Sequence, residues 1–263
     1  MIVAGCDVGS LTAKAVIMND NSVVAHEIIK IRATTVVSAT EVMKKALSSS
    51  SLQFSDINYC CSTGYGRYEI PFAQMNMSEI SCHGLGAFWT DPSIRTIIDI
   101  GGQDCKVILI DETGNVRDFI MNDKCAAGTG RSLEILAKTI GVELEELGPL
   151  ALQSKKPINI TNKCSIFMEL EVLNHLYTRK KIRHIACGIA DAVAKRVAAL
   201  AKAVDVEDDI CITGGVSKNP GVIRQLCQHM NVSFKSLPID PQIIGALGAA
   251  VFAMRARQAG GNL

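Results

Sequence analysis

The sequence contains no Cys-x-x-Cys pair, although ten of its 263 residues are cysteines. Local zinc sites and ferredoxin-type clusters use such closely spaced thiols, so both are disfavoured. The chain also has no apolar run of transmembrane length, and Met1 leads straight into an apolar strand pattern rather than a basic leader segment. We therefore expect a cytoplasmic protein with no membrane partner, whose cysteines are reduced thiols or metal ligands.

An excess of charge of either sign is missing too. Lysine and arginine number 27 and aspartate and glutamate 26, a formal net charge of +1. Such a balance does not predict nucleic acid as a partner. The hydrophobic share of 48% and the charged share of 20% are typical of a soluble globular protein. The length favours one large domain or two closely joined ones.

Two similar strand–turn–strand units are present, about ninety residues apart. The triplets Asp7-Val8-Gly9 and Asp99-Ile100-Gly101 each end an apolar strand pattern and begin a glycine turn. This repeat indicates an internal duplication. Backbone N–H groups in such turns cradle phosphates, and the carboxylates can hold Mg²⁺ through water. The pattern predicts two facing units with a phosphate-binding cleft.

Periodicity predicts the remaining elements. The expected strands cover 2–10, 13–18, 23–31, 57–62, 96–102, 105–110, 116–121 and 209–213, with a last one near Val232. The expected helices cover 36–47, 133–140, 166–177 and 185–200, with further ones opened by Pro220 and by Gly245.

Cys125 and Cys164 differ from the other cysteines in their position. Each follows a lysine and precedes a helical pattern. Unpaired N–H groups and the dipole at a helix start favour a thiolate, or an anionic metal–sulfur centre held by one. Because the two are far apart in sequence, two half-buried structural cysteines remain an alternative. Cys82 beside His83 is either a ligand pair or a core cysteine, and the remaining seven lie in strand or helix patterns.

The glycine motifs together resemble the ATPase fold shared by actin, sugar kinases and Hsp70 chaperones. The matching segments are 7–14 and 99–106 for the two phosphate motifs, 213–221 for the adenosine motif and 245–250 for the closing connector. The resemblance implies an α/β fold of two duplicated ribonuclease-H-like lobes with a nucleotide cleft between them. We expect an N-terminal lobe over 1–95, onto which the C-terminal helix 243–263 packs back, and a C-terminal lobe over 96–242.

Four segments, 63–67, 99–104, 121–131 and 213–216, look more closely like the activator (component A) of 2-hydroxyacyl-CoA dehydratases, of the BadF/BadG/HgdC-type ATPase family. Relatives include the ATP-hydrolysing subunits of benzoyl-CoA reductase. The resemblance implies a homodimer bridged by one [4Fe–4S] cluster, with Cys125 and Cys164 as each chain's ligands. It further implies ATP hydrolysis coupled to one-electron transfer from a donor such as ferredoxin or flavodoxin. The electron would pass to a dehydratase or a benzoyl-CoA-reductase-like component.

The same resemblance implies roles at the nucleotide. Asp7 and Asp99 would hold Mg²⁺ or its waters, and Gln103 would orient the attacking water or sense the γ-phosphate. Asp104 would polarise that water, or else cap a turn. The other expected contacts with ATP or ADP are Ser10, Leu11, Thr12, Ala13, Lys14, Gly101, Gly102, Gly214, Gly215 and Gln242. Leu11 departs from the hydroxyl residue usual in the family, so phosphate contact in that turn rests on Ser10, Thr12 and backbone N–H groups.

Two rival functions fit the same fold. A small-molecule kinase would need a substrate pocket with a carboxylate base, and a nucleotide-dependent scaffold like actin would need no chemistry beyond ATP. Neither gives Cys125 and Cys164 a purpose. A brown, anaerobically purified protein with iron–sulfur absorption would exclude both.

Overall fold

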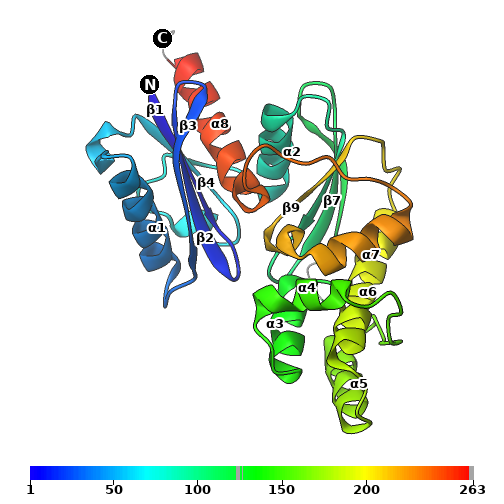
Figure 1. Cartoon of the computed structure of the whole chain (residues 1–263). Coiled ribbons are helices and arrows are strands. Elements are labelled where there is room, and N and C mark those ends of the chain that lie inside the picture. Colours follow the sequence, from blue (N-terminus) through cyan, green and yellow to red (C-terminus); the bar gives the residue numbers. More distant parts are fainter. Residues whose placement is uncertain (123–124, 126, 261–263) are drawn as a thin grey trace. The chain divides into compact units, whose positions relative to one another are not determined.

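The computed structural model describes residues 1–122, 125 and 127–260. The chain forms two compact units. The first contains Met1–Ile97, Leu109–Arg117 and Leu237–Leu263, and the second contains Ile98–Ile108 and Asp118–Ser236. Figure 1 colours them along the sequence. None of the helices within the described residues is both long and apolar enough to cross a membrane.

The first unit is built on a five-stranded sheet of order β3-β2-β1-β4-β5. Its strands are β1 (Ile2–Val8), β2 (Thr12–Asn19), β3 (Ser22–Lys30), β4 (Tyr59–Thr63) and β5 (Met75–Asn76). The first three form an antiparallel meander, whereas β4 runs parallel to β1. Asp7 therefore pairs with Lys14 on one side and with Thr63 on the other. The end of β1 thus places three polar residues side by side.

Helices cover both faces of this sheet (Figure 1). Helix α1 (Thr35–Ser49) begins where Thr34 accepts a hydrogen bond from Val37 N, and it packs on the face that carries Ala4, Cys6 and Val8. Helix α8 (Ile244–Gly260) packs on the other face, and α2 (Glu79–Thr90) packs on α8. Glycines let these backbones touch, because a methyl group at Gly5 would lie 1.9 Å from the carbonyl oxygen of Ala246.

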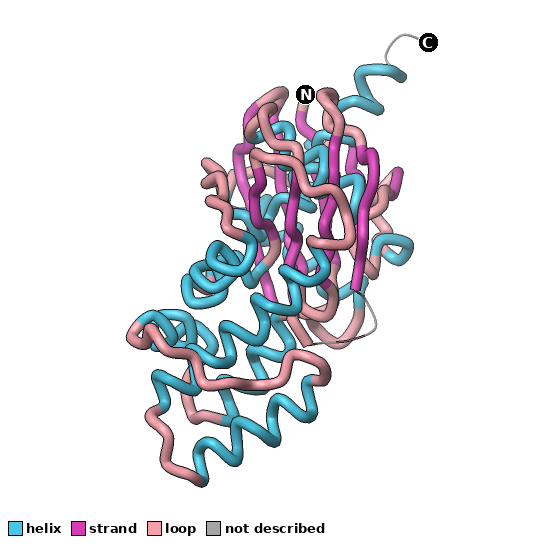
Figure 2. The backbone as a smooth tube through the Cα atoms, turned by 90° about the vertical axis from the view of Figure 1, so that its right-hand side faces the viewer, coloured by secondary structure: helices cyan, strands magenta, loops and turns pink. Residues whose placement is uncertain are grey.

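Most of a four-stranded sheet of order β8-β7-β6-β9 lies in the second unit. Its strands are β6 (Thr96–Ile100), β7 (Cys105–Ile110), β8 (Val116–Asn122) and β9 (Ile210–Thr213). The helices of this unit are α3 (Gly130–Thr139), α4 (Leu144–Leu152), α5 (Ser165–Tyr177), α6 (Ile182–Ala201) and α7 (Pro220–Met230). Helix α6 is buried along most of its length and packs on α4 and α7. Helices α3 and α5 form an end of this unit away from its strands (Figures 1 and 2).

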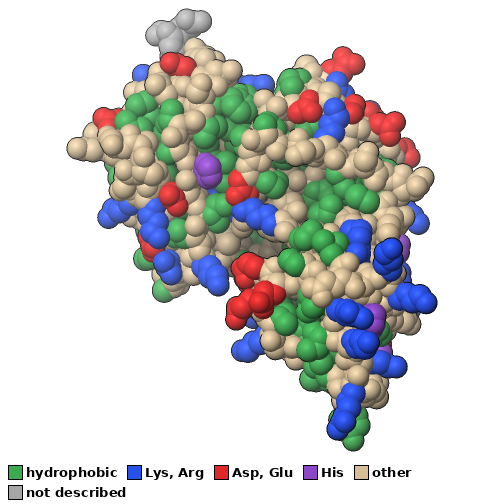
Figure 3. Space-filling model, viewed as in Figure 1, with side chains coloured by type: hydrophobic (Ala, Val, Ile, Leu, Met, Phe, Trp, Pro, Cys, Tyr) green, Lys and Arg blue, Asp and Glu red, His purple; other side chains and the backbone are tan. Residues whose placement is uncertain are grey.

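Helix α5 buries little of its apolar surface. Only Met168 and Val172 are buried, whereas five large apolar side chains are exposed: Ile166, Phe167, Leu170, Leu173 and Tyr177. Hydrophobic side chains are visible at this end of the second unit in Figure 3. An exposed apolar stripe of this kind is typical of a contact with another protein.

Most of the predicted strands and helices are confirmed, with four differences, one of which is the short strand β5, which the sequence did not predict. The strand expected near Val232 is wrong: Asn231 ends α7 in a left-handed conformation, and only a single bridge between Cys211 and Lys235 follows. Helices α2 and α4 were not predicted. Their glycines, such as Gly86 and Gly148, weaken helix propensity, but they allow close packing on neighbouring segments. Four short 3₁₀ turns complete the described chain: η1 (Phe54–Asp56), η2 (Arg67–Glu69), η3 (Gly215–Lys218) and η4 (Pro241–Ile243).

Candidate functional site

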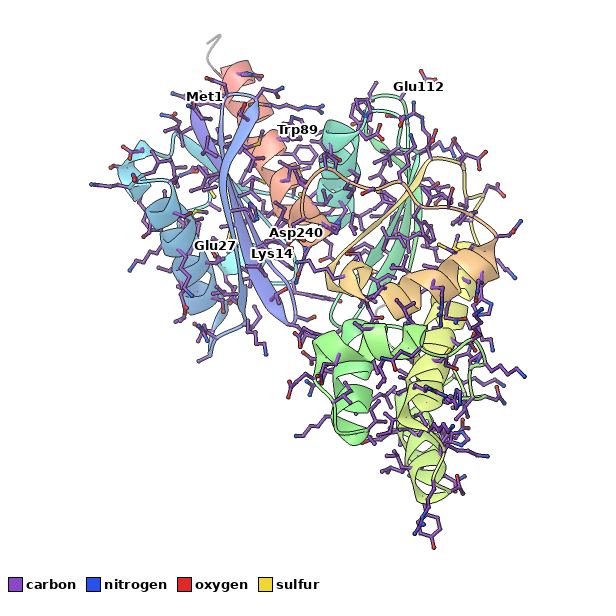
Figure 4. All side chains as sticks on the ribbon, viewed as in Figure 1. Met1, Lys14, Glu27, Trp89, Glu112 and Asp240 are labelled. Carbon is purple, nitrogen blue, oxygen red and sulfur yellow. The ribbon has the colours of Figure 1, made fainter. Side chains whose placement is uncertain are left out.

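The first candidate site is the hairpin between β1 and β2. Asp7 is 5% exposed, and its Oδ2 accepts a hydrogen bond from Lys14 Nζ at 3.0 Å. Figure 4 labels Lys14 on this hairpin. The turn is closed by a hydrogen bond of 3.1 Å from Gly9 N to Thr12 O. The structure therefore places a buried carboxylate beside a glycine turn here and pairs it with Lys14.

Backbone from two other elements of the first unit lies against the same carboxylate. Gly64 follows β4 with φ of +84°, and a methyl group there would lie 2.4 Å from Asp7 Oδ1. At the start of α8, a methyl group on Gly245 would lie 3.3 Å from Asp7 Oδ2 and 2.8 Å from His83 Nε2. A larger residue at Gly64 would displace the carboxylate, whereas one at Gly245 would meet the His83 ring first.

The second candidate site is the hairpin between β6 and β7. Asp99 is 3% exposed, and its Oδ2 lies 3.3 Å from Lys106 Nζ. The same ammonium group also donates a hydrogen bond to the carboxylate of Asp104. Thr213 on β9 donates a hydrogen bond of 3.0 Å to Asp99 Oδ1. Four polar side chains thus form one buried cluster.

The two hairpins correspond residue by residue. Asp7 and Lys14 in the first occupy the places of Asp99 and Lys106 in the second. The correspondence extends to the strands β4 and β9. Each ends in a threonine followed by a glycine at positive φ: Thr63 and Gly64 in the first copy, and Thr213 and Gly214, with φ of +82°, in the second. A methyl group there would lie 2.7 Å from Asp99 Oδ1. The sequence pattern assigns no role to Lys106, although Lys14 at the same place in the other copy is a signal that could have identified it.

Asp104 has both a turn contact and a side-chain contact. Its carbonyl oxygen accepts a hydrogen bond of 3.0 Å from Gly101 N, which closes the turn. Its carboxylate binds Lys106 and is 4% exposed. Gln103, the preceding residue, is exposed. Within this turn, Gln103 is therefore the side chain most accessible to a ligand.

The other residues expected at the nucleotide lie in three places. Ser10, Leu11 and Thr12 are partly exposed in the first hairpin, where Ala13 is buried. In the second unit, Gly101 and Gly102 form the hairpin turn, and Gly214 and Gly215 follow β9. Gln242 belongs to the first unit, in η4, where its N–H donates to Asp240 Oδ1 at 2.9 Å; Asp240 is labelled in Figure 4.

The turn of the second hairpin is bonded to helix α3. Gly130 N donates to Gly101 O at 2.9 Å, and Arg131 N donates to Gly102 O at 2.8 Å. These donors are among the first amides of α3, which have no acceptor within the helix. The candidate phosphate turn and the start of α3 therefore share two backbone hydrogen bonds.

The two singled-out cysteines lie in neighbouring segments of the second unit. Cys164 is the N-cap residue of α5, as predicted. Cys125 is not at a helix start, because Gly128 turns the chain with φ of +94° and α3 begins only at Gly130. Its Sγ lies 3.9 Å from Lys163 O, next to Cys164, and both cysteines are partly exposed. Asp123, Lys124 and Ala126 of this motif lie outside the described residues.

Most of the other cysteines have the character of core residues. Burial raises the pKa of the Cys61 thiol to about 12, and it raises the pKa of several others above their usual range: Cys6, Cys60, Cys82, Cys105, Cys187 and Cys227. Cys82 is fully buried, which confirms its interpretation as a core cysteine. Across the described part of the chain, no three His, Cys, Asp or Glu side chains are grouped to hold a metal ion.

Distant structural neighbours define the class of fold. The chain superimposes on the ethanolamine utilization protein EutJ of Carboxydothermus hydrogenoformans with a TM-score of 0.62 at 13% identity, over 96% of this chain and 90% of that one. A ROK family glucokinase of Streptomyces griseus follows with 0.58 at 12% identity, over 97% and 100%. These confirm the predicted actin- and sugar-kinase-like α/β fold.

The chain belongs to the BadF/BadG/BcrA/BcrD ATPase family, whose model matches residues 4–253. It is 41% identical to the 2-hydroxyisocaproyl-CoA dehydratase activator of Clostridioides difficile, over 96% of this chain and 95% of the relative. It is 39% identical to the (R)-2-hydroxyglutaryl-CoA dehydratase activating ATPase of Acidaminococcus fermentans, over 95% and 96%. The solved structure of the former with bound ADPNP has a TM-score of 0.94 and 40% identity, covering 100% of this chain and 98% of its own. The predicted resemblance is confirmed.

Proposed function

We propose that this protein is an ATP-hydrolysing, electron-transferring activator of a 2-hydroxyacyl-CoA dehydratase or a related reductase. It acts in the cytoplasm as a homodimer, and Cys125 and Cys164 of each chain hold one shared [4Fe–4S] cluster. The observation that carries the proposal is the approach of Cys125 Sγ to the carbonyl oxygen of Lys163, the residue before Cys164, in a chain similar to dehydratase activators. Both cysteines are also partly exposed to solvent.

The residues present fit the cluster in number and in chemistry. A cubane cluster takes four thiolates. One chain brings two partly exposed thiols from adjoining segments, so a two-fold dimer supplies four. Cys164 also lies at the start of α5, whose unpaired amides favour negative charge. When bound, the cluster supplies a one-electron carrier. The exposed apolar stripe of α5, which begins beside Cys164, supports a protein contact at this place.

The residues of the two hairpins fit Mg-ATP. Mg²⁺ usually takes one or two carboxylates and completes its shell with water and phosphate oxygens, and Asp7 and Asp99 are suitable carboxylates. Ser10, Thr12 and the turn amides bind phosphate oxygens. Gln103 orients the attacking water, because hydrolysis of this kind depends on an aligned water and on charge neutralisation. The adenosine is bound by Gly214, Gly215 and Gln242.

Coupling between the nucleotide and the electron transfer is supported by the bonded contact with α3. The turn that would bind phosphate shares two hydrogen bonds with Gly130 and Arg131. This helix start follows directly on the segment that carries Cys125. A shift of the turn on ATP binding therefore changes the surroundings of Cys125. The kinase and scaffold alternatives rest on the fold alone, at 12% and 13% identity.

Iron analysis of the anaerobically purified protein tests the proposal. We expect about four irons per two chains, a brown colour, and loss of both in Cys125→Ala and Cys164→Ala. Cys227→Ala is the matched control, because Cys227 is also partly exposed but lies within α7. An intact cluster in Cys164→Ala, or four irons in each chain of a monomer, would contradict the bridging arrangement.

Activation of a dehydratase tests the second half of the proposal. The wild-type protein, supplied with ATP and reduced ferredoxin or flavodoxin, is expected to activate the 2-hydroxyisocaproyl-CoA dehydratase or a dehydratase from its own source. Omitting ATP, or replacing it with a non-hydrolysable analogue, should abolish activation. Turnover that is independent of ATP would count against the proposed coupling.

A further inference from the structure

Lys106 is the most conspicuous buried charge in the second unit. Its side chain is 2% exposed, and its ammonium group contacts the carboxylates of both Asp99 and Asp104. Burying an ammonium group is costly unless it is paired, so two carboxylates at one ammonium group account for its position. The three charges form a compact cluster at the base of the turn that contains Gln103.

The same two carboxylates are oxygen donors of the kind that a divalent cation selects. Mg²⁺ prefers carboxylate oxygens, and two carboxylates close together attract a cation strongly. In the structure an ammonium group already lies at both of them. It neutralises part of their charge, and a cation at this point would have to compete with it.

We propose that Lys106 is an internal counter-cation that prevents Mg²⁺ from binding at Asp99 and Asp104 without nucleotide. The metal ion then enters as the nucleotide complex, whose phosphates supply the further ligands. This inference rests on the proposed function, because it assumes that Mg-ATP binds at the second hairpin. It assigns to Lys106 a positioning role: the lysine sets when the carboxylates receive a metal ion.

The first hairpin supplies a natural control. Lys14 contacts the single carboxylate of Asp7, and Thr12 occupies the place that Asp104 has in the second hairpin. Removing Lys14 would leave one carboxylate, which is a weak cation site by itself. Removing Lys106 would leave two.

Cation binding without nucleotide tests the proposal. The variant is Lys106→Met, which keeps the length of the side chain and removes its charge. Mg²⁺ alone is titrated into the full-length, anaerobically purified protein by calorimetry, and the melting temperature is followed in parallel. We expect Lys106→Met to bind Mg²⁺ at least about tenfold more tightly than wild type and to be stabilised by it. Wild type and Lys14→Met are expected to show little binding and no shift in melting temperature.

A double variant separates the role of Lys106 from a purely structural one. Lys106→Met with Asp104→Asn has a single carboxylate left, so it is expected to fold without Mg²⁺ and to lose the gain in cation affinity. If Lys106→Met folds only when Mg²⁺ is present, the proposal is supported. If it is folded but has the cation affinity of wild type, or stays unfolded at every Mg²⁺ concentration, the proposal is overturned. Tight Mg²⁺ binding by the nucleotide-free wild type would overturn it too.

These measurements do not depend on ATP hydrolysis or on iron content. A protein without a cluster or ATPase activity that still shows the expected cation binding would refute the proposed function and leave intact only the exclusion of Mg²⁺ by Lys106. The opposite pattern would remove only the role of Lys106.

Discussion

The two hairpins are copies of one design, and they differ most in how firmly each carboxylate is held. In the second copy, Asp99 is bonded to both Lys106 and Thr213. In the first copy, Asp7 is bonded to Lys14, whereas Thr63 Oγ1 is buried and makes no hydrogen bond to Asp7. The lysine of the first copy is also more accessible, with a side chain 13% exposed against 2%. The second carboxylate is thus more fully constrained.

This difference indicates that the two duplicated sites have different roles. A carboxylate with several buried partners is held in one position, whereas one with a single partner has more freedom to move. We therefore expect substitutions in the second hairpin to affect stability and chemistry, and substitutions in the first to affect chiefly nucleotide affinity.

The largest expected effect is on stability. Lys106→Met should lower the free energy of unfolding by about 3–5 kcal/mol in Mg²⁺-free buffer, because it leaves two buried carboxylates without their counter-charge. Lys14→Met should cost roughly 1 kcal/mol, since that ion pair is partly accessible to water and involves one carboxylate. Chemical denaturation monitored by circular dichroism measures both. Equal losses would show that the two lysines are equivalent after all.

The second effect is on catalysis. Gln103→Ala should lower kcat for ATP hydrolysis by about 100-fold without affecting the melting temperature, because the side chain is exposed and is proposed to orient water. Asp99→Ala should also reduce hydrolysis far more than it alters folding. Steady-state phosphate release gives the rates. Hydrolysis at the wild-type rate in both variants would show that the assigned roles are wrong.

The third effect tests whether the ends of β4 and β9 are equivalent. Gly64→Ala and Gly214→Ala each introduce a side chain at positive φ, and its methyl group would lie within 2.7 Å of an aspartate oxygen. Both should destabilise by about 1–3 kcal/mol. Gly141→Ala is the matched control, since Gly141 has φ of +74° with no atom within 4 Å, and it should cost only about 1 kcal/mol. A loss confined to one of the two glycines would break the correspondence between the copies.

The smallest effect concerns Leu11, which corresponds to Gln103 in the other copy. Leu11→Thr adds a hydroxyl group to a partly exposed turn. Because such a group can donate one hydrogen bond to a phosphate, it should lower KM for ATP by about threefold and leave kcat unchanged. A fall in kcat would mean that residue 11 contributes to the chemistry rather than to binding.

Much of this fold could be predicted because the signals are local. The apolar strands that end in Asp7 and Asp99, the glycine turns and the helix start at Cys164 are all visible in short windows of sequence. The repeat then relates the two halves. Even the buried lysine could be predicted from the sequence, because Lys106 has the same spacing from Asp99 that Lys14 has from Asp7.

The features that could not be predicted depend on contacts between distant segments. Helix α2 contains Gly84 and Gly86, which argue against a helix locally. They are explained by the atoms they face, since a methyl group on Gly86 would lie 2.3 Å from Ile244 O. The position of Cys125 was mispredicted for a related reason. A turn at Gly128 intervenes, and the helix starts where its amides meet the carbonyls of Gly101 and Gly102.

That last contact has a consequence for mutational scanning. The bonds from Gly130 and Arg131 to the turn use only backbone atoms, so replacing the side chain of Arg131 with alanine leaves both in place. Alanine at this position would therefore miss the connection between the turn and α3. Proline is the substitution that reveals it, because it removes the N–H and is tolerated in the first turn of a helix. Arg131→Pro should preserve the helix yet delete one of the two bonds, and Arg131→Ala is its silent counterpart.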